Sequence, residues 1–365
     1  MIFPVQTVSS LSKALKWVQL VFFTIVILYF GKVLFVPLLF GLLIALIMYP
    51  ICKKLEHRGL PRTLSISILL SFIILLFVGL LWLLGVEMNI FLRDLPLVSE
   101  RLSKLSPDLK KLIEESFKIS AADQSSWIQK LTSNMDKDIT IFLKGLLNAT
   151  ISTLIMLVMI PIYAALFLYH RGTFVRYLEL LLGPDHGNQL QLILRESVYS
   201  YFNFIKGNFY VYCIVGVLNS LGLLALGIHN AILYGMLSSF MMVIPYVGIF
   251  ISASIPVCIA LVTKDSIWYP IGVISIFVFI QYLESNVIFP RVVGSQLNLS
   301  TWATLVAIIA GVILWGIAGM VLVTPFLAIL KIVTDHVPDW KALNVLLNRS
   351  EGYQGKKKAI LVSKK

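Results

Sequence analysis

The sequence has few charged residues. Only 13% of its 365 residues are Asp, Glu, Lys or Arg, and 58% are hydrophobic, whereas soluble domains carry about 25% charged residues. Apolar runs of 17 residues or more recur along the chain, and each is long enough to cross a hydrocarbon core of about 30 Å. This composition excludes an ordinary soluble domain and predicts an all-α polytopic membrane protein.

The sequence also lacks the patterns of common enzymes and metal proteins. Its three cysteines, Cys52, Cys213 and Cys258, are far apart and form no Cys-x-x-Cys pair, which argues against a disulfide framework or a zinc site. There is no His-Glu-x-x-His, no glycine-rich phosphate loop and no Gly-x-Ser-x-Gly. We therefore expect no enzymatic activity, no cofactor and no metal.

About eight hydrophobic segments can be read from the sequence. Six are clear spans, at residues 14–31, 33–49, 64–86, 146–169, 209–228 and 267–289. Two further runs, 231–262 and 301–330, are too long for one straight crossing and contain proline or glycine near the middle. Each is either one tilted, kinked helix or two short helices forming a re-entrant hairpin, as in many transporters.

Basic residues gather at the two ends of the chain. Residues 1–62 carry seven Lys or Arg against one acid, and residues 331–365 carry eight against three, whereas 87–144 is balanced at nine each. The positive-inside rule then places both termini in the cytoplasm and the 87–145 region outside. Anionic lipid beside a basic cytoplasmic face explains the net charge of +12, so no nucleic-acid partner is expected.

These patterns suggest five parts. They are an N-terminal transmembrane scaffold of three spans (1–86), a small helical extracytoplasmic insert (87–145), a fourth span with a cytoplasmic interfacial helix (146–207), a substrate-handling transmembrane unit with broken helices (208–332), and a basic cytoplasmic tail (333–365).

The region from 208 to 330 contains only four formal charges, Lys264, Asp265, Glu284 and Arg291. Glu284 ends an apolar run, and an ionisable group deep in a membrane marks a functional site by default because its burial is costly. Gln281 lies three residues earlier, so a helix places both side chains on one face.

Pro290 follows this segment and predicts that the helix ends at Phe289. Such a break would bring Asn286, free carbonyl groups and Arg291 to one depth. Two readings stay open. Glu284 is either a structural partner of Arg291 or a neighbouring helix, or a proton- or cation-responsive group lining a transport path, with Asn286 and Gln281 as polar ligands.

Two other features belong to the candidate path. Pro245, Tyr246 and Gly248 lie midway along the first long run, where proline and glycine suit a hairpin tip or a plain helix kink. Asn219 lies among small residues in the preceding span and is either a hydrogen bond between helices or a substrate contact.

Three motifs together resemble the autoinducer-2 exporter family of bacterial permeases. They are Ile244-Pro245-Tyr246-Val247-Gly248, then Gln281-x-x-Glu284-x-Asn286-x-x-x-Pro290-Arg291-Val292-Val293-Gly294, then Gly311 to Gly316-x-x-Gly319 with Pro325. The order of spans and the insert agree with the family. The chain departs from it at Ser300, where members usually have proline after the leucine, and serine leaves the entry to the last run less rigid.

The resemblance implies an exporter of a small polar solute in the bacterial inner membrane, assembled as a homo-oligomer of five copies. Its substrate would be a furanone signal such as autoinducer-2, or a cation, because some members are associated with sodium or lithium efflux in exchange for protons. The alternatives are therefore a cation/proton antiporter that uses the same residues, and a non-transporting scaffold or accessory membrane protein.

Overall fold

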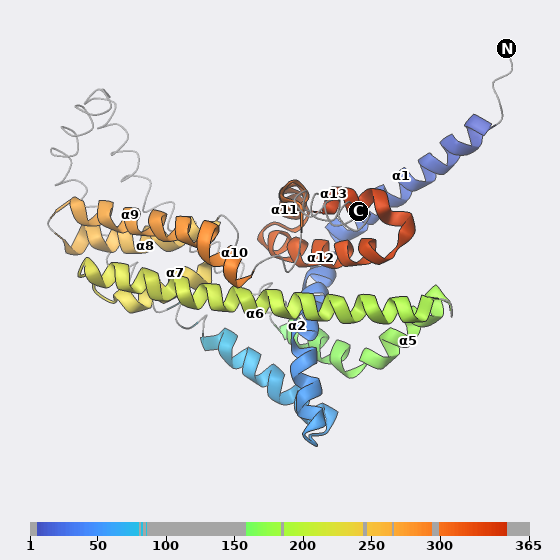
Figure 1. The fold of residues 1–365 in the computed structure, drawn as a ribbon, viewed down its shortest axis with the longest axis horizontal. Helices are drawn as coiled ribbons and strands as arrows, with labels where there is room; N and C mark the ends of the chain where they lie inside the picture. The colour runs from blue at the N-terminus through green and yellow to red at the C-terminus, as the bar shows by residue number, and fades with distance from the viewer. Residues whose placement is uncertain are drawn as a thin grey trace, which may run out of the picture. The chain divides into compact units, whose positions relative to one another are not determined.

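The computed structural model describes residues 6–79, 82, 85, 158–183, 186–243, 247–264, 266–293 and 299–348. Within these residues the chain is helical, and its β structure is limited to an isolated bridge between Leu299 and Asn348. The predicted all-α class is therefore confirmed (Figure 1). The predicted insert at 87–145 and the last residues of the basic tail lie outside the described ranges.

Several helices have the length and composition of membrane spans. Among the residues described, five qualify, and a bent pair adds a sixth if it counts as one span. The five are Lys32–His57, Arg62–Gly79, Gly187–Ala225, Trp268–Val292 and Ile317–His336, and the pair, bent by 67°, is Val158–Tyr169 with Arg171–Leu182. Many of their large apolar side chains are exposed, as is typical of helices that face lipid.

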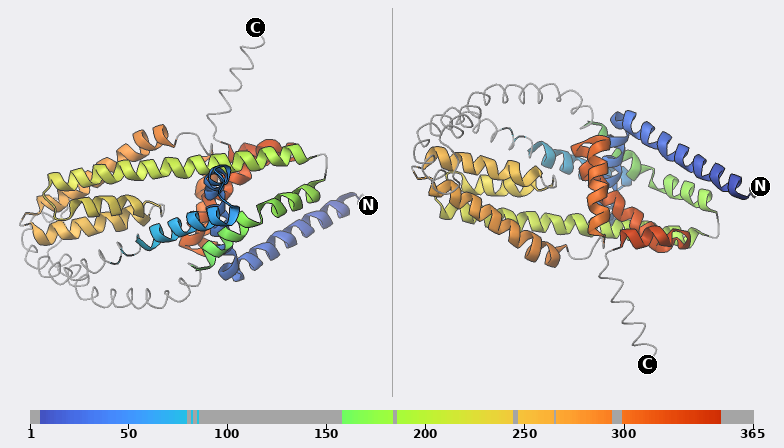
Figure 2. Two further views of the ribbon diagram at one scale, coloured as in Figure 1. Left: turned by 90° about the horizontal axis from the view of Figure 1, so that it is seen from below. Right: turned by 90° about the horizontal axis from the view of Figure 1, so that it is seen from above.

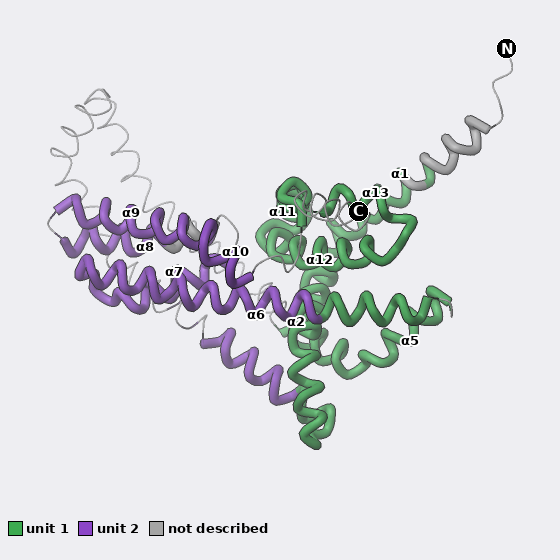
Figure 3. Tube along the Cα trace, viewed as in Figure 1, with its two compact units in different colours: residues 1–66, 156–198, 298–365 green, residues 67–155, 199–297 purple. Residues whose placement is uncertain are grey.

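The chain divides into two compact units, coloured green and purple in Figure 3. Unit 1 comprises residues 1–66, 156–198 and 298–365, and unit 2 comprises residues 67–155 and 199–297. Helix α6 (Gly187–Ala225) contributes residues to both. The division into five parts stays a prediction; α6 runs without a break through its boundary at 207–208.

Unit 1 contains both ends of the described chain. Its elements are α1 (Gln6–Phe30), α2 (Lys32–His57), the bent pair that ends in α5 (Arg171–Leu182), α11 (Thr301–Trp315), α12 (Ile317–His336), the 3-10 turn η3 (Pro338–Trp340) and α13 (Lys341–Leu347). Polar contacts join the ends of these helices. Arg171 pairs with Glu56, and Arg62 donates a hydrogen bond to the Leu168 carbonyl at 2.6 Å.

The run 301–330 forms a helical hairpin in unit 1. Gly316 has φ +64°, a left-handed conformation that glycine tolerates, and it separates α11 from α12. Gly311 and Gly319 bring the two backbones together, since a Cβ on Gly311 would lie 2.6 Å from the Gly319 carbonyl oxygen. At the tip, Trp315 Nε1 donates to the Leu28 carbonyl oxygen at 2.8 Å. Two helices therefore replace one long span.

Unit 2 holds the later part of α6 with α7 (Ala231–Met241), α8 (Val247–Thr263) and α9 (Trp268–Leu283), which lie side by side in Figures 1 and 2. Its main core brings Ala231 and Tyr234 at the start of α7 together with Ile259 and Ala260 near the end of α8. The start of α8 returns to the end of α7, because Gly248 packs directly on the Met241 carbonyl. The run 231–262 is therefore also a hairpin, with helices of 11 and 17 residues.

The prediction that the helix ends at Phe289 is wrong. After α9 the chain makes a π-helical turn, η2 (Glu284–Ile288), and continues as α10 (Phe289–Val292). The backbone N–H of Phe289 bonds to the Glu284 carbonyl, five residues back. This wider turn restarts the helix just before Pro290, which then occupies a first-turn position where a missing N–H costs little.

Candidate functional site

A polar cluster lies on α9 and η2 in unit 2. Gln281 Nε2 donates to Glu284 Oε2 at 2.8 Å and lies 3.3 Å from Ser285 Oγ. Ser285 Oγ donates to the same Glu284 oxygen at 3.0 Å. The half-buried Glu284 carboxylate thus accepts hydrogen bonds from neutral donors. No ion pair to it occurs among the described residues. The predicted single face for Gln281 and Glu284 is confirmed.

A small cavity adjoins this cluster. Its volume is about 10 Å³, close to the space that one water molecule needs. Its lining joins Asn219 of α6, Ser238 of α7 and Gln281 of α9 with four apolar residues, Val215, Met242, Phe277 and Ile280. Three helices far apart in sequence therefore place polar side chains around one point.

Asn219 is the least satisfied polar residue of this cavity. The residue is only 3% exposed, and its Oδ1 has no hydrogen-bond partner. An unsatisfied buried acceptor costs about 1–3 kcal/mol, so native proteins retain few of them. We considered that Asn219 forms a hydrogen bond between helices. In the described part of the chain, Oδ1 accepts no such bond.

Close helix packing places Asn219 next to the cavity. Gly216 leaves room for α7, since a Cβ there would lie 2.8 Å from both Met236 Sδ and Ser239 Oγ. The neighbouring Ser220 Oγ lies 2.7 Å from the Gly216 carbonyl and 3.3 Å from the Ile232 carbonyl of α7. Ser220 therefore links the helices, and Asn219 is left facing the cavity.

The other predicted site residues that the structure describes form no described hydrogen bond with this cluster. Asn286 and Arg291 are exposed and bond back to their own helix, at the carbonyls of Tyr282 (3.0 Å) and Val287 (3.2 Å). Pro290 is exposed as well, and Gly248 packs at the α7–α8 junction. Pro245 and Tyr246 lie outside the described residues. The Glu284–Arg291 pair that we considered is not among the described ion pairs.

Ser238 and Ser285 were missed by the sequence reading. Ser285 directly follows Glu284 and could have been included on that ground. Ser238 lies in the apolar run 231–262 and has no neighbouring charge in the sequence that would single it out. Only the packing of α7 against α6 and α9 brings it to the cavity.

Comparison with known proteins gives one consistent result. The family described as AI-2E family transporter matches residues 18–339. The chain is 27% identical to YrrI of Bacillus subtilis (strain 168), which is provisionally named a transport protein, over 84% of this chain and 87% of that protein. It is 23% identical to the AI-2 transport protein TqsA of Escherichia coli (strain K12), over 87% of this chain and 90% of TqsA.

Proposed function

Because the chain belongs to the AI-2E family of membrane transporters, we propose that it exports a small polar solute through unit 2, along a path whose polar part is Asn219, Gln281 and Glu284. The observation that carries this proposal is the buried, unpartnered Asn219 Oδ1 beside a cavity shared with Gln281. A solute hydroxyl or N–H would satisfy that oxygen, and the Glu284 carboxylate is one hydrogen bond away.

The π turn is a second support. It shares its first residue with the candidate site, since Glu284 begins η2, and π turns inside α-helices occur often at functional sites. A shift in the hydrogen-bond register of this turn would move the residues that begin it. Glu284 is therefore the residue whose position would respond first to a change in this turn.

The name of TqsA makes autoinducer-2 the first solute to test. Purified protein in proteoliposomes is assayed for flux of autoinducer-2 and of neutral hydroxylated solutes of similar size. E284Q should lower the flux at least about tenfold, the loss expected when a charge-assisted hydrogen bond is removed, and N219A, which removes a neutral acceptor, should lower it about two- to tenfold. Unchanged flux in both variants would contradict the assignment of the path.

Matched controls keep this test specific. E179Q makes the same exchange on α5, where Glu179 accepts from Gln191 at 3.3 Å. N203A makes the same exchange at an exposed position of α6. Both should retain the flux of the natural sequence.

A second candidate function is cation/proton antiport. It is favoured by the acidic character of the cluster, which presents a carboxylate and amide oxygens with no base among the described partners of Glu284. Hard cations prefer such oxygen ligands. A sodium gradient imposed across the vesicles separates the two: only an antiporter should move protons in response, and a protonophore should then change sodium flux.

Family membership favours transport over the scaffold alternative. The cytoplasmic placement of both termini and the homo-oligomer of five copies stay predictions. Labelling with a membrane-impermeant thiol reagent of a single cysteine introduced in the basic tail (333–365) tests the first, after the native cysteines are replaced. Mass measurement of the protein in lipid nanodiscs tests the second.

A further inference from the structure

Polar side chains of unit 1 gather where three apolar helices begin or end. Helix α2 ends at His57, a second helix begins at Arg62, and the helix Val158–Tyr169 ends two residues before Arg171, the first residue of α5. These helices belong to the candidate membrane spans, so we expect their ends at the level of the lipid headgroups. We call the polar residues at this place the arginine junction: Glu56, Arg62, Ser65 and Arg171.

The two arginines of the junction are held in defined orientations. The hydrogen bond of Arg62 and the ion pair of Arg171 described above each fix one nitrogen of a guanidinium group. The guanidinium carbon of Arg62 also lies 5.6 Å from the centre of the Tyr169 ring. That of Arg171 lies 5.3 Å from the centre of the Tyr49 ring. Groups ordered in advance lose less entropy when a ligand binds.

The junction nevertheless has unused hydrogen-bonding groups. A guanidinium group carries five N–H bonds, and the buried atoms Arg62 Nε and Arg171 Nη1 have no partner. Ser65 is fully buried one turn after Arg62, and its Oγ has no partner either. Among the described residues, five buried side-chain atoms are unsatisfied, and three of them belong to this junction. Unsatisfied groups in such number indicate a water, an ion or a ligand.

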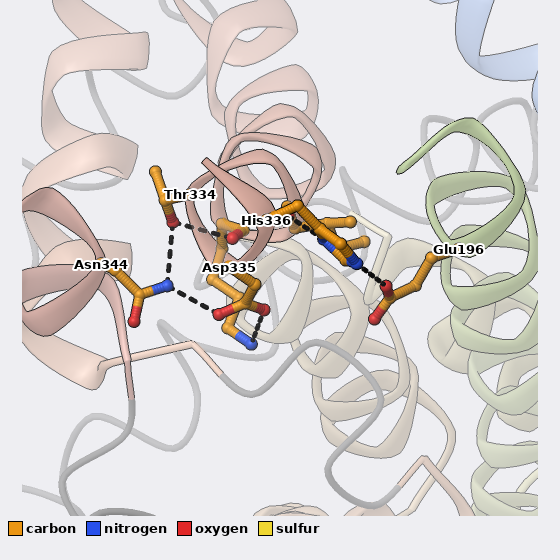
Figure 4. Close-up of polar contacts among 7 residues, drawn as sticks. Glu196, Thr334, Asp335, His336 and Asn344 are labelled. Atoms are coloured by element: carbon orange, nitrogen blue, oxygen red, sulfur yellow. Dashed lines mark hydrogen bonds and ion pairs between the residues drawn. The ribbon is translucent and has the colours of Figure 1, made fainter. Parts of the chain in front are cut away.

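A second polar cluster of unit 1, at the end of α12, satisfies its own members (Figure 4). Asn344 donates to Thr334 Oγ1 at 3.1 Å and to Asp335 Oδ1 at 2.6 Å. Asp335 also pairs with Lys331. Within this described cluster, no buried side-chain nitrogen or oxygen lacks a partner. Unsatisfied donors are therefore a property of the arginine junction and not of polar helix ends in general.

The charges of the junction favour an anion. Glu56 is within Coulombic reach of both arginines, but its single negative charge balances only one of them. Arg62 forms no ion pair among the described residues, so one positive charge is left over. The planar guanidinium group matches the oxygens of a phosphate, and a phosphodiester supplies the one negative charge that is missing.

An exposed apolar face leads to the junction along the helix Val158–Tyr169. Its exposed side chains fall at helical spacing and so share one face; they are Val158, Ile162, Leu166 and Tyr169. Tyrosine at the end of such a face is typical of the boundary between lipid tails and headgroups. A lipid with its tails on this face has its headgroup beside Arg62. The apolar face therefore favours a lipid phosphate over free phosphate.

We propose that the arginine junction binds the phosphate group of an anionic phospholipid. The phosphate oxygens accept hydrogen bonds from Arg62 and Arg171, as in other basic pockets between membrane helices. The Tyr169 ring, whose residue is 50% exposed, moves aside to admit them. The lipid tails lie on the exposed face of the helix Val158–Tyr169. The bound lipid joins the helix ends of unit 1 and does not depend on which solute is transported.

Native mass spectrometry of the full-length protein in detergent tests the site. The first phosphatidylglycerol should bind about fivefold more tightly than phosphatidylcholine with the same tails, because only phosphatidylglycerol has a net negative charge. R62Q should weaken this phosphatidylglycerol about tenfold, the loss of one charge-assisted hydrogen bond. Equal affinity of the natural sequence for the two lipids, or unchanged affinity in R62Q, would overturn the proposal.

Two further arms separate a built site from general attraction and a lipid from free phosphate. R58Q removes the same charge from an exposed position of the loop before Arg62, and should change the affinity less than about twofold. Equal losses in R58Q and R62Q would mean that only the net charge of the loop acts, which contradicts the site. Millimolar inorganic phosphate should leave the first lipid bound. Displacement of the lipid would assign the junction to free phosphate and overturn the lipid site.

A measurement on the natural sequence covers the case in which R62Q folds poorly. Hydrogen exchange is compared between nanodiscs of phosphatidylglycerol and nanodiscs of phosphatidylcholine. Peptides covering residues 56–65 should exchange about two- to fivefold more slowly in phosphatidylglycerol, because the bound lipid stabilises these helix ends. Peptides covering residues 334–344, in the satisfied cluster of Figure 4, should exchange equally in both. Equal rates at 56–65, or the same slowing at 334–344, would contradict a lipid site at the junction.

Discussion

Two carboxylates of unit 1 and one carboxylate of unit 2 have different kinds of partner. In unit 1, Glu56 pairs with Arg171, and Asp335 pairs with Lys331. Each of these pairs joins residues at or near the ends of apolar helices. The charge of a paired carboxylate is neutralised by its partner. Such a carboxylate is less able to bind a ligand.

Unit 2 contains a carboxylate of another kind. Glu284 has only the neutral donors Gln281 and Ser285 as described partners, and the acceptor of Asn219 nearby has none. Such groups cost free energy in an apolar unit. The comparison teaches that two carboxylates of unit 1 hold helix ends through ion pairs, whereas the described partners of Glu284 in unit 2 are all neutral.

The largest expected effect on solute flux comes from giving Glu284 a basic partner, as Glu56 and Asp335 have in unit 1. Q281K places a base beside the carboxylate and should lower solute flux tenfold to about a hundredfold, because the new ion pair occupies the group that the solute needs. The thermal midpoint should not fall. Proteoliposome flux and thermal unfolding in detergent measure the two effects.

Q191K is the matched control for that change. Gln191 also donates to a glutamate, Glu179, but at an exposed position of unit 1. It should leave the flux unchanged. If Q281K transported normally, the view that Glu284 must stay unpaired would be wrong.

The next effect is the loss of a pair in unit 1. R171M leaves Glu56, which is only 20% exposed, without its partner, and should lower the free energy of unfolding by about 1–3 kcal/mol, between the values for surface and buried pairs. Denaturant unfolding in detergent measures it. The double variant E56Q/R171M should recover part of the loss, and R176M, at an exposed position of α5, should have little effect.

A smaller effect of opposite sign is expected at Asn219. N219L removes the unsatisfied acceptor and fills its place with an apolar side chain of similar size, so the free energy of unfolding should rise by about 1 kcal/mol. Flux should fall at the same time, as expected when a site is kept at a cost in stability. A variant that lost stability would show that Asn219 has a structural partner, and N203L, at an exposed position, serves as the control.

More of the fold than of the candidate site could be predicted from the sequence. The lengths of the two long runs, 32 and 30 residues, already showed that a single straight helix does not suit them and left a kinked helix or a hairpin, because a helix of about 30 residues exceeds one crossing. The contact between Gln281 and Glu284 also followed from their spacing. Both conclusions depend on local geometry, which the order of residues determines directly.

The rest of the site depends on geometry that the sequence does not display. The π turn adds one residue to a helical turn, and each residue rotates the following side chains by about 100°, which turns Arg291 away from the face of Glu284. Asn286 is two residues from Glu284, a spacing that does not share a helix face. The approach of Asn219 to Gln281 depends on how α6 packs against α9. That packing is a long-range contact, and no spacing within either helix specifies it.

The smallest effect tests whether charge, rather than single backbone hydrogen bonds, holds the ends of unit 1. Ser300 donates its N–H to the Leu347 carbonyl at 2.7 Å, and its φ of −65° already suits proline. S300P therefore loses one bond worth about 1 kcal/mol and gains about 0.4–1 kcal/mol because the unfolded chain becomes stiffer. The net change in unfolding free energy should stay within about 0.5 kcal/mol, and S300A, which keeps the N–H, should match it. A loss above about 2 kcal/mol in S300P alone would mean that the Leu347 bond, and not the ion pairs, secures the C-terminal part of unit 1.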